Sequence, residues 1–211
     1  MYEKILPEKT RENLELLKGF DFLKDFYLAG GTGCSIWFEH RISKDLDFFS
    51  SINFVPSKLR DALREKGKLT VENIGEGTFT GEFNGTMMSF FHYPYPLIEK
   101  KKEYRGLYIA HWSDIACMKI DSISSRGKKR DFIDLYITIK KGEMSLENIL
   151  ALFRRKYRDV HFNLVHIIKS FSFFEDADND PMPEMLIEID WEEVKEFFIT
   201  ESKKILTDKV C

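Results

Sequence analysis

The sequence is poor in cysteine and lacks long uncharged runs. Its three cysteines, Cys34, Cys117 and Cys211, form no CxxC motif and cannot all pair within one chain, which is typical of a protein kept in a reducing compartment. No stretch approaches the ~18 uncharged residues that a membrane-spanning helix needs. Residues 1–18 contain several glutamates and no continuous apolar run, so they do not resemble a signal peptide. We therefore expect a cytoplasmic protein with no membrane partner.

The sequence also lacks an excess of charge of either sign. Lys and Arg number 32, Asp and Glu number 35, and the formal net charge is −3. Bulk charge thus predicts neither a general polyanion-binding protein nor a membrane-surface protein, and a nucleic-acid substrate would need a local basic patch. Hydrophobic residues make up 43% of the chain, which supports a folded core.

Hydrophobic spacing and turn residues predict a mixed α/β part over residues 1–102 and a helical part over residues 103–211. In the first part we expect a helix from Pro7, strands at 26–29 and 46–49, a helix at 56–66 and hairpin strands between 68 and 95. In the second part we expect helices at 113–126, 131–140, from Ser145, at 160–174 and at 191–206, with an acidic loop at 176–183.

The first candidate binding feature is Gly30-Gly31-Thr32, which follows the apolar run at 26–29. Glycines let backbone amides approach a ligand closely, and the start of a helix offers unpaired N–H groups to phosphate. Thr32 adds a hydroxyl donor and is expected to cap the helix that follows. Taken alone, the pattern is more often an ordinary tight turn.

The second feature is Asp45-Leu46-Asp47 at the start of an apolar strand. Residues two apart on a strand point the same way, so both carboxylates would face one side while Leu46 points into the core. Two converging carboxylates suit Mg²⁺ or Mn²⁺. Alone, the pattern also fits a solvated strand end.

Only a short helix separates these two features. Together they form the arrangement needed to hold a nucleoside triphosphate by its phosphates while a metal ion neutralises its charge. Phosphoryl and nucleotidyl transfer depend mainly on positioning and electrostatics, so few side chains are required.

Ordered motifs along the chain resemble the nucleotidyltransferases of the AbiEii/AbiGii toxin family. The motifs are FYLAGGT at 26–32, HRISKDLDFF at 40–49, and DIACMK at 114–119 followed by Arg126 and by KRDFIDLY at 129–136. Because they occur in the same order, the resemblance is more specific than any one motif.

The resemblance implies an α+β fold like that of DNA polymerase β, with a mixed sheet, flanking helices and a helical C-terminal part that completes the site. It implies metal-dependent transfer of a nucleotide from an NTP to an acceptor, which in some members is the tRNA acceptor end. Family members often act as toxins beside a cognate antitoxin. The implied catalytic residues are Asp45, Asp47, Lys119 and Asp131; the first two would bind Mg²⁺, and Gly30, Gly31 and Thr32 would hold the triphosphate.

The sequence departs from the wider superfamily at one place. A later strand usually supplies a third carboxylate as activating base and metal ligand, but the corresponding segment here, 87–91, contains no acid. Ser89 could occupy that place, or Asp131 or Asp134 could substitute from the helical part. The missing acid favours a rival interpretation, a non-catalytic nucleotide- or partner-binding module. The intact pair of aspartates on the earlier strand argues against that rival.

Basic residues of the helical part have two interpretations each. Lys119 either lies along the flank of a core helix or points at a bound anion. The other basic residues could bind phosphates of the triphosphate or of an RNA acceptor, or lie in solvent at helix junctions, and a protein or small-molecule acceptor remains an alternative. The candidates are Arg126 and Lys129 as substrate-binding residues, their neighbours Lys128 and Arg130, and the group Arg154, Arg155, Lys156 and Arg158.

Overall fold

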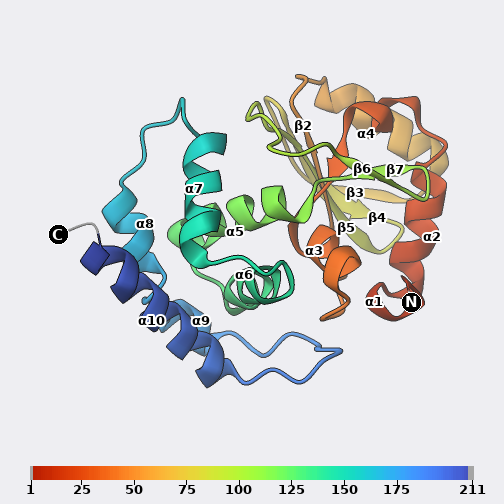
Figure 1. Ribbon diagram of the computed structural model, residues 1–211. Helices are drawn as coiled ribbons and strands as arrows, with labels where there is room; N and C mark the ends of the chain where they lie inside the picture. Colours follow the sequence, from red (N-terminus) through yellow and green to blue (C-terminus); the bar gives the residue numbers. More distant parts are fainter. Residues whose placement is uncertain (1, 209–211) are drawn as a thin grey trace.

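The computed structural model describes residues 2–208, which form a seven-stranded mixed sheet with a group of helices beside it (Figure 1). The elements that precede the helical group are α1 (Tyr2–Ile5), α2 (Glu8–Leu17), η1 (Asp21–Asp25), β1 (Tyr27–Leu28), α3 (Gly30–Phe38), β2 (Leu46–Ser50), α4 (Pro56–Lys66), β3 (Leu69–Gly75), β4 (Thr78–Phe83), β5 (Thr86–His92), β6 (Lys102–Tyr104) and β7 (Leu107–Ile109). The helical group comprises α5 (Trp112–Arg126), α6 (Lys129–Lys141), α7 (Leu146–Lys156), α8 (Leu164–Ser170), α9 (Glu175–Asn179) and α10 (Trp191–Asp208).

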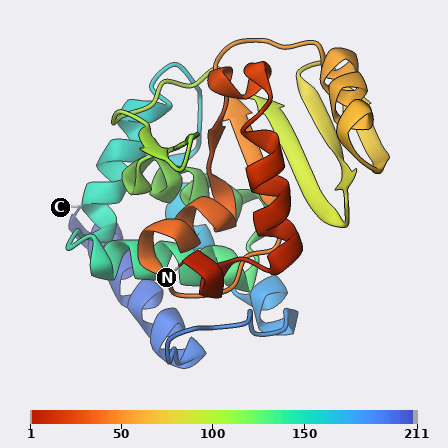
Figure 2. The same ribbon diagram turned by 90° about the vertical axis from the view of Figure 1, so that its right-hand side faces the viewer.

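The sheet places β2 at its centre, in the order β3-β4-β5-β2-β1-β7-β6. β2 runs parallel to β5 and antiparallel to β1. Along β2, Leu46 and Phe48 are buried in a core that α2 and α4 cover, whereas Asp47 and Phe49 point to the opposite face. Figure 2 shows α2 lying across the sheet. The period-two alternation of a strand therefore sends its polar side chains towards the helical group.

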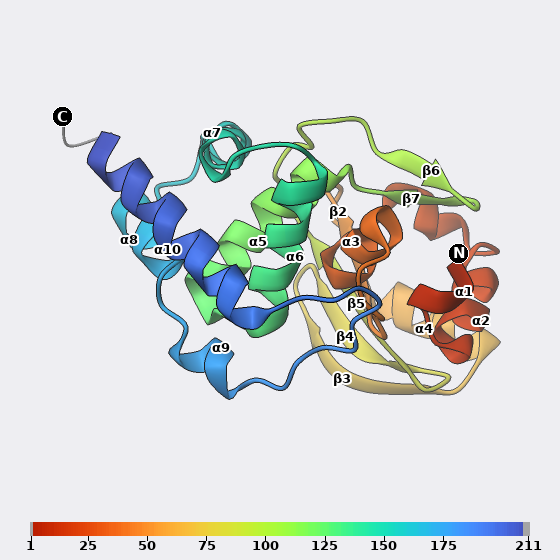
Figure 3. The same ribbon diagram turned by 60° about the horizontal axis from the view of Figure 1, so that its bottom comes forward.

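The helical group is built around α5, which leaves the sheet directly after β7 and lies beside α6 (Figure 3). Gly127 ends α5 in the left-handed conformation at φ 52°. α6 contributes an unbroken buried face that packs on α5, α3 and α10. Within residues 2–208, no helix is both long enough and apolar enough to cross a membrane.

Several expectations from the sequence are corrected by the structure. β6 and β7 join the sheet, so the α/β part continues to Ile109 rather than ending at residue 102. The helix expected at 160–174 is reduced to α8, because Asn163 caps a later start, and the acidic loop at 176–183 begins inside α9. Thr32 does not cap α3, since the helix already begins at Gly30 with Ala29 as its N-cap.

A loop between α9 and α10 returns from the helical group to the α/β part; we call residues 180–190 the returning loop. The Ile42 N–H donates to the Glu184 carbonyl (2.8 Å) and the Leu186 N–H donates to the His40 carbonyl (2.9 Å). An isolated antiparallel bridge joins Arg41 to Met185 between these bonds. Figure 3 shows the loop reaching from α9 towards α3. The two parts are thus connected by α5 and again by this loop.

Candidate active site

The glycine turn brings the start of α3 against an acidic strand. Gly30 has φ +60°, and a Cβ built on it would lie 2.6 Å from Oδ2 of Asp47. A Cβ on Gly31 would lie 2.3 Å from Nη2 of Arg41. Only glycine permits both the left-handed backbone and these close approaches. The first turn of α3 therefore has a carboxylate on one side and a guanidinium on the other.

Thr32 connects the two sequence motifs rather than opening onto the cavity. Its side chain is buried, and its hydroxyl donates to the Asp45 carbonyl and is hydrogen-bonded to Ser43 Oγ (2.8 Å). The expectation that this hydroxyl donates to a triphosphate is therefore corrected, because the group is already used within the protein. The bond fixes where the strand with the two aspartates begins relative to α3.

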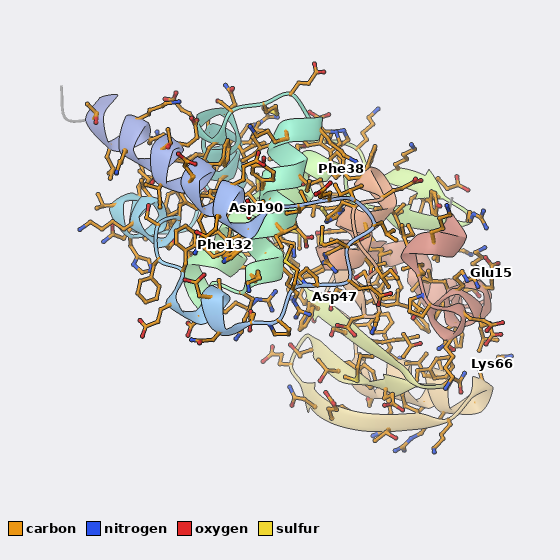
Figure 4. All side chains as sticks on the ribbon, turned by 90° about the horizontal axis from the view of Figure 1, so that it is seen from below. Glu15, Phe38, Asp47, Lys66, Phe132 and Asp190 are labelled. Atoms are coloured by element: carbon orange, nitrogen blue, oxygen red, sulfur yellow. The ribbon has the colours of Figure 1, made fainter. Side chains whose placement is uncertain are left out.

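Asp45 and Asp47 both line a cavity of about 740 Å³ between the sheet and the helical group. Figure 4 shows Asp47 at this junction. Burial, and then the nearby Asp45 carboxylate, raise the pKa of Asp47, although Lys119, a hydrogen bond from Ser89 and Arg126 act in the opposite direction. The same-face arrangement expected from the DxD spacing is present in the structure.

Ser89 occupies the strand position next to Asp47. β2 and β5 run parallel with Asp47 and Ser89 as register partners, and Ser89 also lines the cavity. Of the three alternatives for the missing carboxylate, the structure favours this one. Asp131 and Asp134, the other two candidates, are fully buried and do not line the cavity.

Lys119 is held at the cavity wall by two buried aspartates. Its Nζ lies 2.7 Å from Asp131 Oδ1 and 2.7 Å from Asp134 Oδ2. Burial would lower the pKa of Lys119, but the two carboxylates outweigh it and raise the pKa. Lys119 is therefore a charged lysine fixed beside the Asp47 strand, and both of its carboxylate partners come from α6.

Arg126 shares the Asp131 carboxylate with Lys119. Its Nε and Nη2 lie 2.9 and 3.1 Å from the two oxygens of Asp131, while its side chain remains 48% exposed and lines the cavity. Burial would raise the pKa of Asp131, but the Lys119 ammonium and the Arg126 guanidinium hold it below its usual value. Asp131 thus positions two cations and leaves neither oxygen free for a metal ion.

Arg41 is a cavity residue that the sequence analysis did not identify as functional. Its Nε and Nη2 lie 2.7 and 2.9 Å from the two oxygens of Asp134, a fork that fixes the plane of the guanidinium. His40 Nε2 is 2.7 Å from the same carboxylate. Cys34, His40 and Asp134 bring ligand atoms within 4.8 Å of one another, but the adjacent Arg41 and Lys119 charges already neutralise Asp134 and oppose a metal ion there.

The neighbouring basic residues of α6 point in different directions. Lys129 is buried, donates to the Asp180 carbonyl (2.6 Å) and lies over the Trp191 ring, and it is not among the cavity-lining residues. The expected substrate-binding role of Lys129 is corrected accordingly, because its ammonium is used to hold the returning loop. Arg130 lines the cavity instead, with Nη1 4.0 Å from Asp45 Oδ2.

The returning loop supplies a wall of the cavity that local sequence patterns did not indicate. Met182, Pro183 and Glu184 line it opposite the strands. Apolar side chains from the sheet and α5 line the remainder, namely Phe49, Met87, Phe91 and Met118. The cavity therefore combines an acidic edge, a set of fixed cations and an apolar surface, as the binding of a metal-bound polyphosphate with an attached ring would require.

Comparisons with known proteins agree with this arrangement. Residues 15–109 match the model of a family described as nucleotidyl transferase AbiEii toxin, Type IV toxin–antitoxin system. The chain is 39% identical over 209 residues to aq_aa25 of Aquifex aeolicus (strain VF5), an uncharacterized protein, with 95% of this chain and 98% of the relative covered.

Two crystal structures from Helicobacter pylori share the fold. One is described as a candidate nucleotidyltransferase and has a TM-score of 0.56 at 16% identity, covering 96% of both chains. The other, JHP933, has a TM-score of 0.54 at 16% identity, covering 96% of this chain and 94% of that one. The α+β fold with a mixed sheet and flanking helices, expected from the sequence, is confirmed.

Proposed function

The chain belongs to the AbiEii nucleotidyltransferase toxin family, and on that premise we propose that it transfers a nucleotide from a nucleoside triphosphate to an acceptor in a metal-dependent reaction. One observation carries the proposal. Asp45 and Asp47 line one cavity together with Arg41, Lys119 and Arg126. Acids that can take a metal ion and cations that can take phosphates are thus brought together in a single site.

The residues on the acidic wall fit Mg²⁺ or Mn²⁺. The donors available are the carboxylates of Asp45 and Asp47 with the Ser89 hydroxyl, which are hard oxygen ligands of the kind these ions prefer. Among the described residues, no basic side chain hydrogen-bonds to Asp47, and burial with the adjacent Asp45 raises its pKa. The Asp47 carboxylate is therefore not neutralised by a direct ion pair. A bound ion would neutralise phosphate oxygens and stabilise the charge that develops at the reacting phosphorus.

The glycine turn and the fixed cations would hold the phosphates. The first turn of α3 offers backbone N–H groups, and Arg41 and Lys119 offer charges whose positions are fixed by buried carboxylates. In the reaction an acceptor oxygen bonds to the α-phosphorus, the bond from that phosphorus to the bridging oxygen breaks, and pyrophosphate leaves. Fixed cations stabilise this departing charge without reorganising.

Ser89 changes how the acceptor would be activated. A serine hydroxyl can orient Asp47 but is a poor base at neutral pH, so the acceptor's proton passes to a cleft aspartate or to water. We infer a slower but intact reaction rather than a non-catalytic module, because such a module has no need for two aspartates and three fixed cations around one cavity. The acceptor is RNA, with tRNA as the leading case, and the alternatives are a protein hydroxyl or a small molecule. The family's description as a toxin supports a cognate antitoxin as a further partner.

A labelling experiment tests the proposal. The purified chain is incubated with each labelled triphosphate, Mg²⁺ and either total cellular RNA or total protein, and the labelled fraction is identified. We expect label in the RNA fraction, lost with EDTA and lost in the Asp47→Asn variant. Triphosphate binding without label in any fraction would show the non-catalytic module instead, and label confined to protein would change the acceptor while leaving nucleotidyl transfer intact.

A further inference from the structure

Three more cavities continue from the active site along the helical group. The first, about 400 Å³, shares Arg126 with the active-site cavity. The second, about 170 Å³, shares Ser124 and His166 with the first. The third, about 510 Å³, shares Val160 and Phe162 with the second. Because neighbouring cavities have lining residues in common, they follow one another from the reacting centre to the end of α7, and we call this series the helical groove.

The far end of the helical groove is strongly basic. Arg154, Arg155, Arg158 and His161 line its last cavity, and no acidic residue does. Among the described residues, Arg154 and Arg155 have no ion pair, and Arg158 makes one exposed contact of 3.4 Å with Asp159. Basic residues are favoured at the end of a helix, but three arginines lining one hollow repel one another and leave a site for a polyanion. Lys156 belongs to the same basic run in the sequence, but its side chain is buried and paired with Asp114, so it adds no charge to this end of the groove.

The middle of the helical groove offers flat surfaces beside isolated charges. Phe173 is 57% exposed and lines the first cavity together with His166 and Lys169. Phe162 lines the next two cavities, but it is half-buried and packs edge-on against Phe153. An exposed aromatic ring beside a basic path, such as that of Phe173, is a surface on which single-stranded bases stack. Two acids, Asp121 and Asp176, also line this middle stretch, so most of the attraction for phosphate lies at the α7 end.

We propose that the helical groove binds the single-stranded RNA segment that leads to the acceptor's reacting hydroxyl. Backbone phosphates contact Arg154, Arg155 and Arg158, a base stacks on Phe173, and the strand passes Arg126 into the active site. This inference rests on the proposed nucleotidyl transfer and names the acceptor's binding surface. A protein acceptor is disfavoured, because the groove ends in unpaired guanidinium groups rather than in an apolar surface.

Binding of labelled single-stranded oligoribonucleotides of increasing length, measured by fluorescence anisotropy without triphosphate or metal, tests the helical groove separately from catalysis. We expect affinity to rise with length until the groove is filled. Arg154→Ala with Arg155→Ala should weaken binding about tenfold or more and reduce the slope of log affinity against log salt by about 1.4, since each phosphate contact on a single strand contributes about 0.7. Phe173→Ala should weaken binding about tenfold while leaving that slope unchanged.

The matched control is Arg64→Ala with Lys66→Ala. These residues are equally exposed in the last turn of α4, on the sheet side of the molecule away from α7 (Figure 1), so affinity and slope should stay near wild type. Equal losses in both double variants would show non-specific attraction and overturn the proposal. Absence of RNA binding, with label transferred to protein, would also overturn it but would leave nucleotidyl transfer standing. Thermal unfolding of each variant confirms that the fold is retained.

Discussion

Two pairs of aspartates flank the cleft, and their oxygens have opposite surroundings. Asp45 and Asp47 come from the sheet and line the cavity; Asp45 is 49% exposed, and within residues 2–208 its one ion pair is with Arg130 at 4.0 Å. The α6 pair is fully buried. Four basic side chains contact that buried pair, namely His40, Arg41, Lys119 and Arg126.

The difference shows how one residue type serves two purposes in one site. Burial would raise the pKa of Asp134, but Lys119 and Arg41 outweigh it and hold the pKa well below its usual range. For Asp47, burial and a second carboxylate prevail, and its pKa is raised. On the proposed function, the buried pair fixes cations that would hold a polyphosphate, and the cleft pair keeps its charge for a cation that would arrive with the substrate.

The strongest test of this comparison is Asp47→Asn. Because no basic side chain depends on Asp47 through a hydrogen bond, the thermal midpoint in metal-free buffer should be close to that of wild type. Transfer should fall about a thousandfold, since a metal ligand supplies several kcal/mol to the transition state. Single-turnover rates with labelled triphosphate measure the loss, and Asp61→Asn on exposed α4 is the control. Full activity in Asp47→Asn would remove this residue from the metal site.

Asp134→Asn should have the opposite outcome for stability. It leaves Arg41 and Lys119 buried with too little negative charge, which costs about 3–5 kcal/mol of unfolding free energy. Chemical denaturation measures this loss. Asp114→Asn breaks another fully buried ion pair, with Lys156, outside the cavity. It should destabilise comparably while transfer per folded molecule is retained, whereas Asp134→Asn should lose both. Equal activity in the two variants would show that Asp134 acts only on stability.

Arg126→Gln tests whether the charge of Arg126 acts on the phosphates rather than on the stability of the fold. The Arg126 side chain is half exposed, so its loss should change stability by less than about 1 kcal/mol. Transfer should fall about 10- to 100-fold, because one fixed charge facing the phosphates is removed. KM and kcat measured together for Arg126→Gln and for the remote Arg64→Gln provide the comparison. A large drop in thermal midpoint without a specific loss of transfer would contradict this role.

Gly30→Ala tests the contact between the glycine turn and the cleft acids. Alanine at φ +60° costs about 1–2 kcal/mol, and its Cβ would displace the Asp47 carboxylate, so both stability and transfer should decrease. At Gly75 an added Cβ meets nothing within 4 Å, so Gly75→Ala should leave both near wild type. Thermal unfolding and rate measurements on the two variants show whether the geometry of the cleft requires glycine at this turn.

The finest test is the pH dependence of stability. The folded pKa of Asp134 is lowered, so its stabilising contribution is complete above the unfolded value of about 3.9 and is lost as pH falls through the folded value. The difference in unfolding free energy between wild type and Asp134→Asn should therefore shrink as pH falls below about 4. Denaturant titrations across this range measure the difference. If the difference in unfolding free energy increased as the pH was lowered, the Asp134 carboxylate of the wild type would not be ion-paired.

Local patterns in the sequence predicted the elements and residues whose geometry depends on near neighbours. Asp45 and Asp47 face one side because strand alternation fixes their direction, and α4 and α5 end where Gly67 and Gly127 stop them. α8 was expected to be longer because apolar residues continue on both sides of it. The capping interaction of Asn163 with the His166 N–H decided its start.

The contacts that local patterns could not predict join distant segments. Arg41 is 93 residues from Asp134, and no spacing rule pairs them. On α6 each residue turns about 100° from the last, so a basic run cannot show which member faces the cleft. Arg130 does, while Lys129 holds the returning loop. The cavity wall formed by residues 182–184 likewise depends on the tertiary fold and not on a local sequence pattern.

The returning loop has a consequence for the order in which the molecule forms. The charged residues of the site lie earlier in the chain than the wall at 182–184. That wall forms only when Ile42 has bonded to Glu184. Closing so long a chain segment costs entropy, and contacts of this separation form late. An emerging chain therefore carries the charged residues of the cleft before it has a closed cleft.

The same loop is attached to both parts of the molecule. Lys128 and Lys129 hold its first residue, Asp180, and two backbone hydrogen bonds and one bridge attach it at residues 40–42. Local opening of the cleft from this side requires only the second set of contacts to break. On the proposed function, release of the contacts at residues 40–42 would let a long acceptor strand be laid into the cleft from the side, with no free end threaded through it.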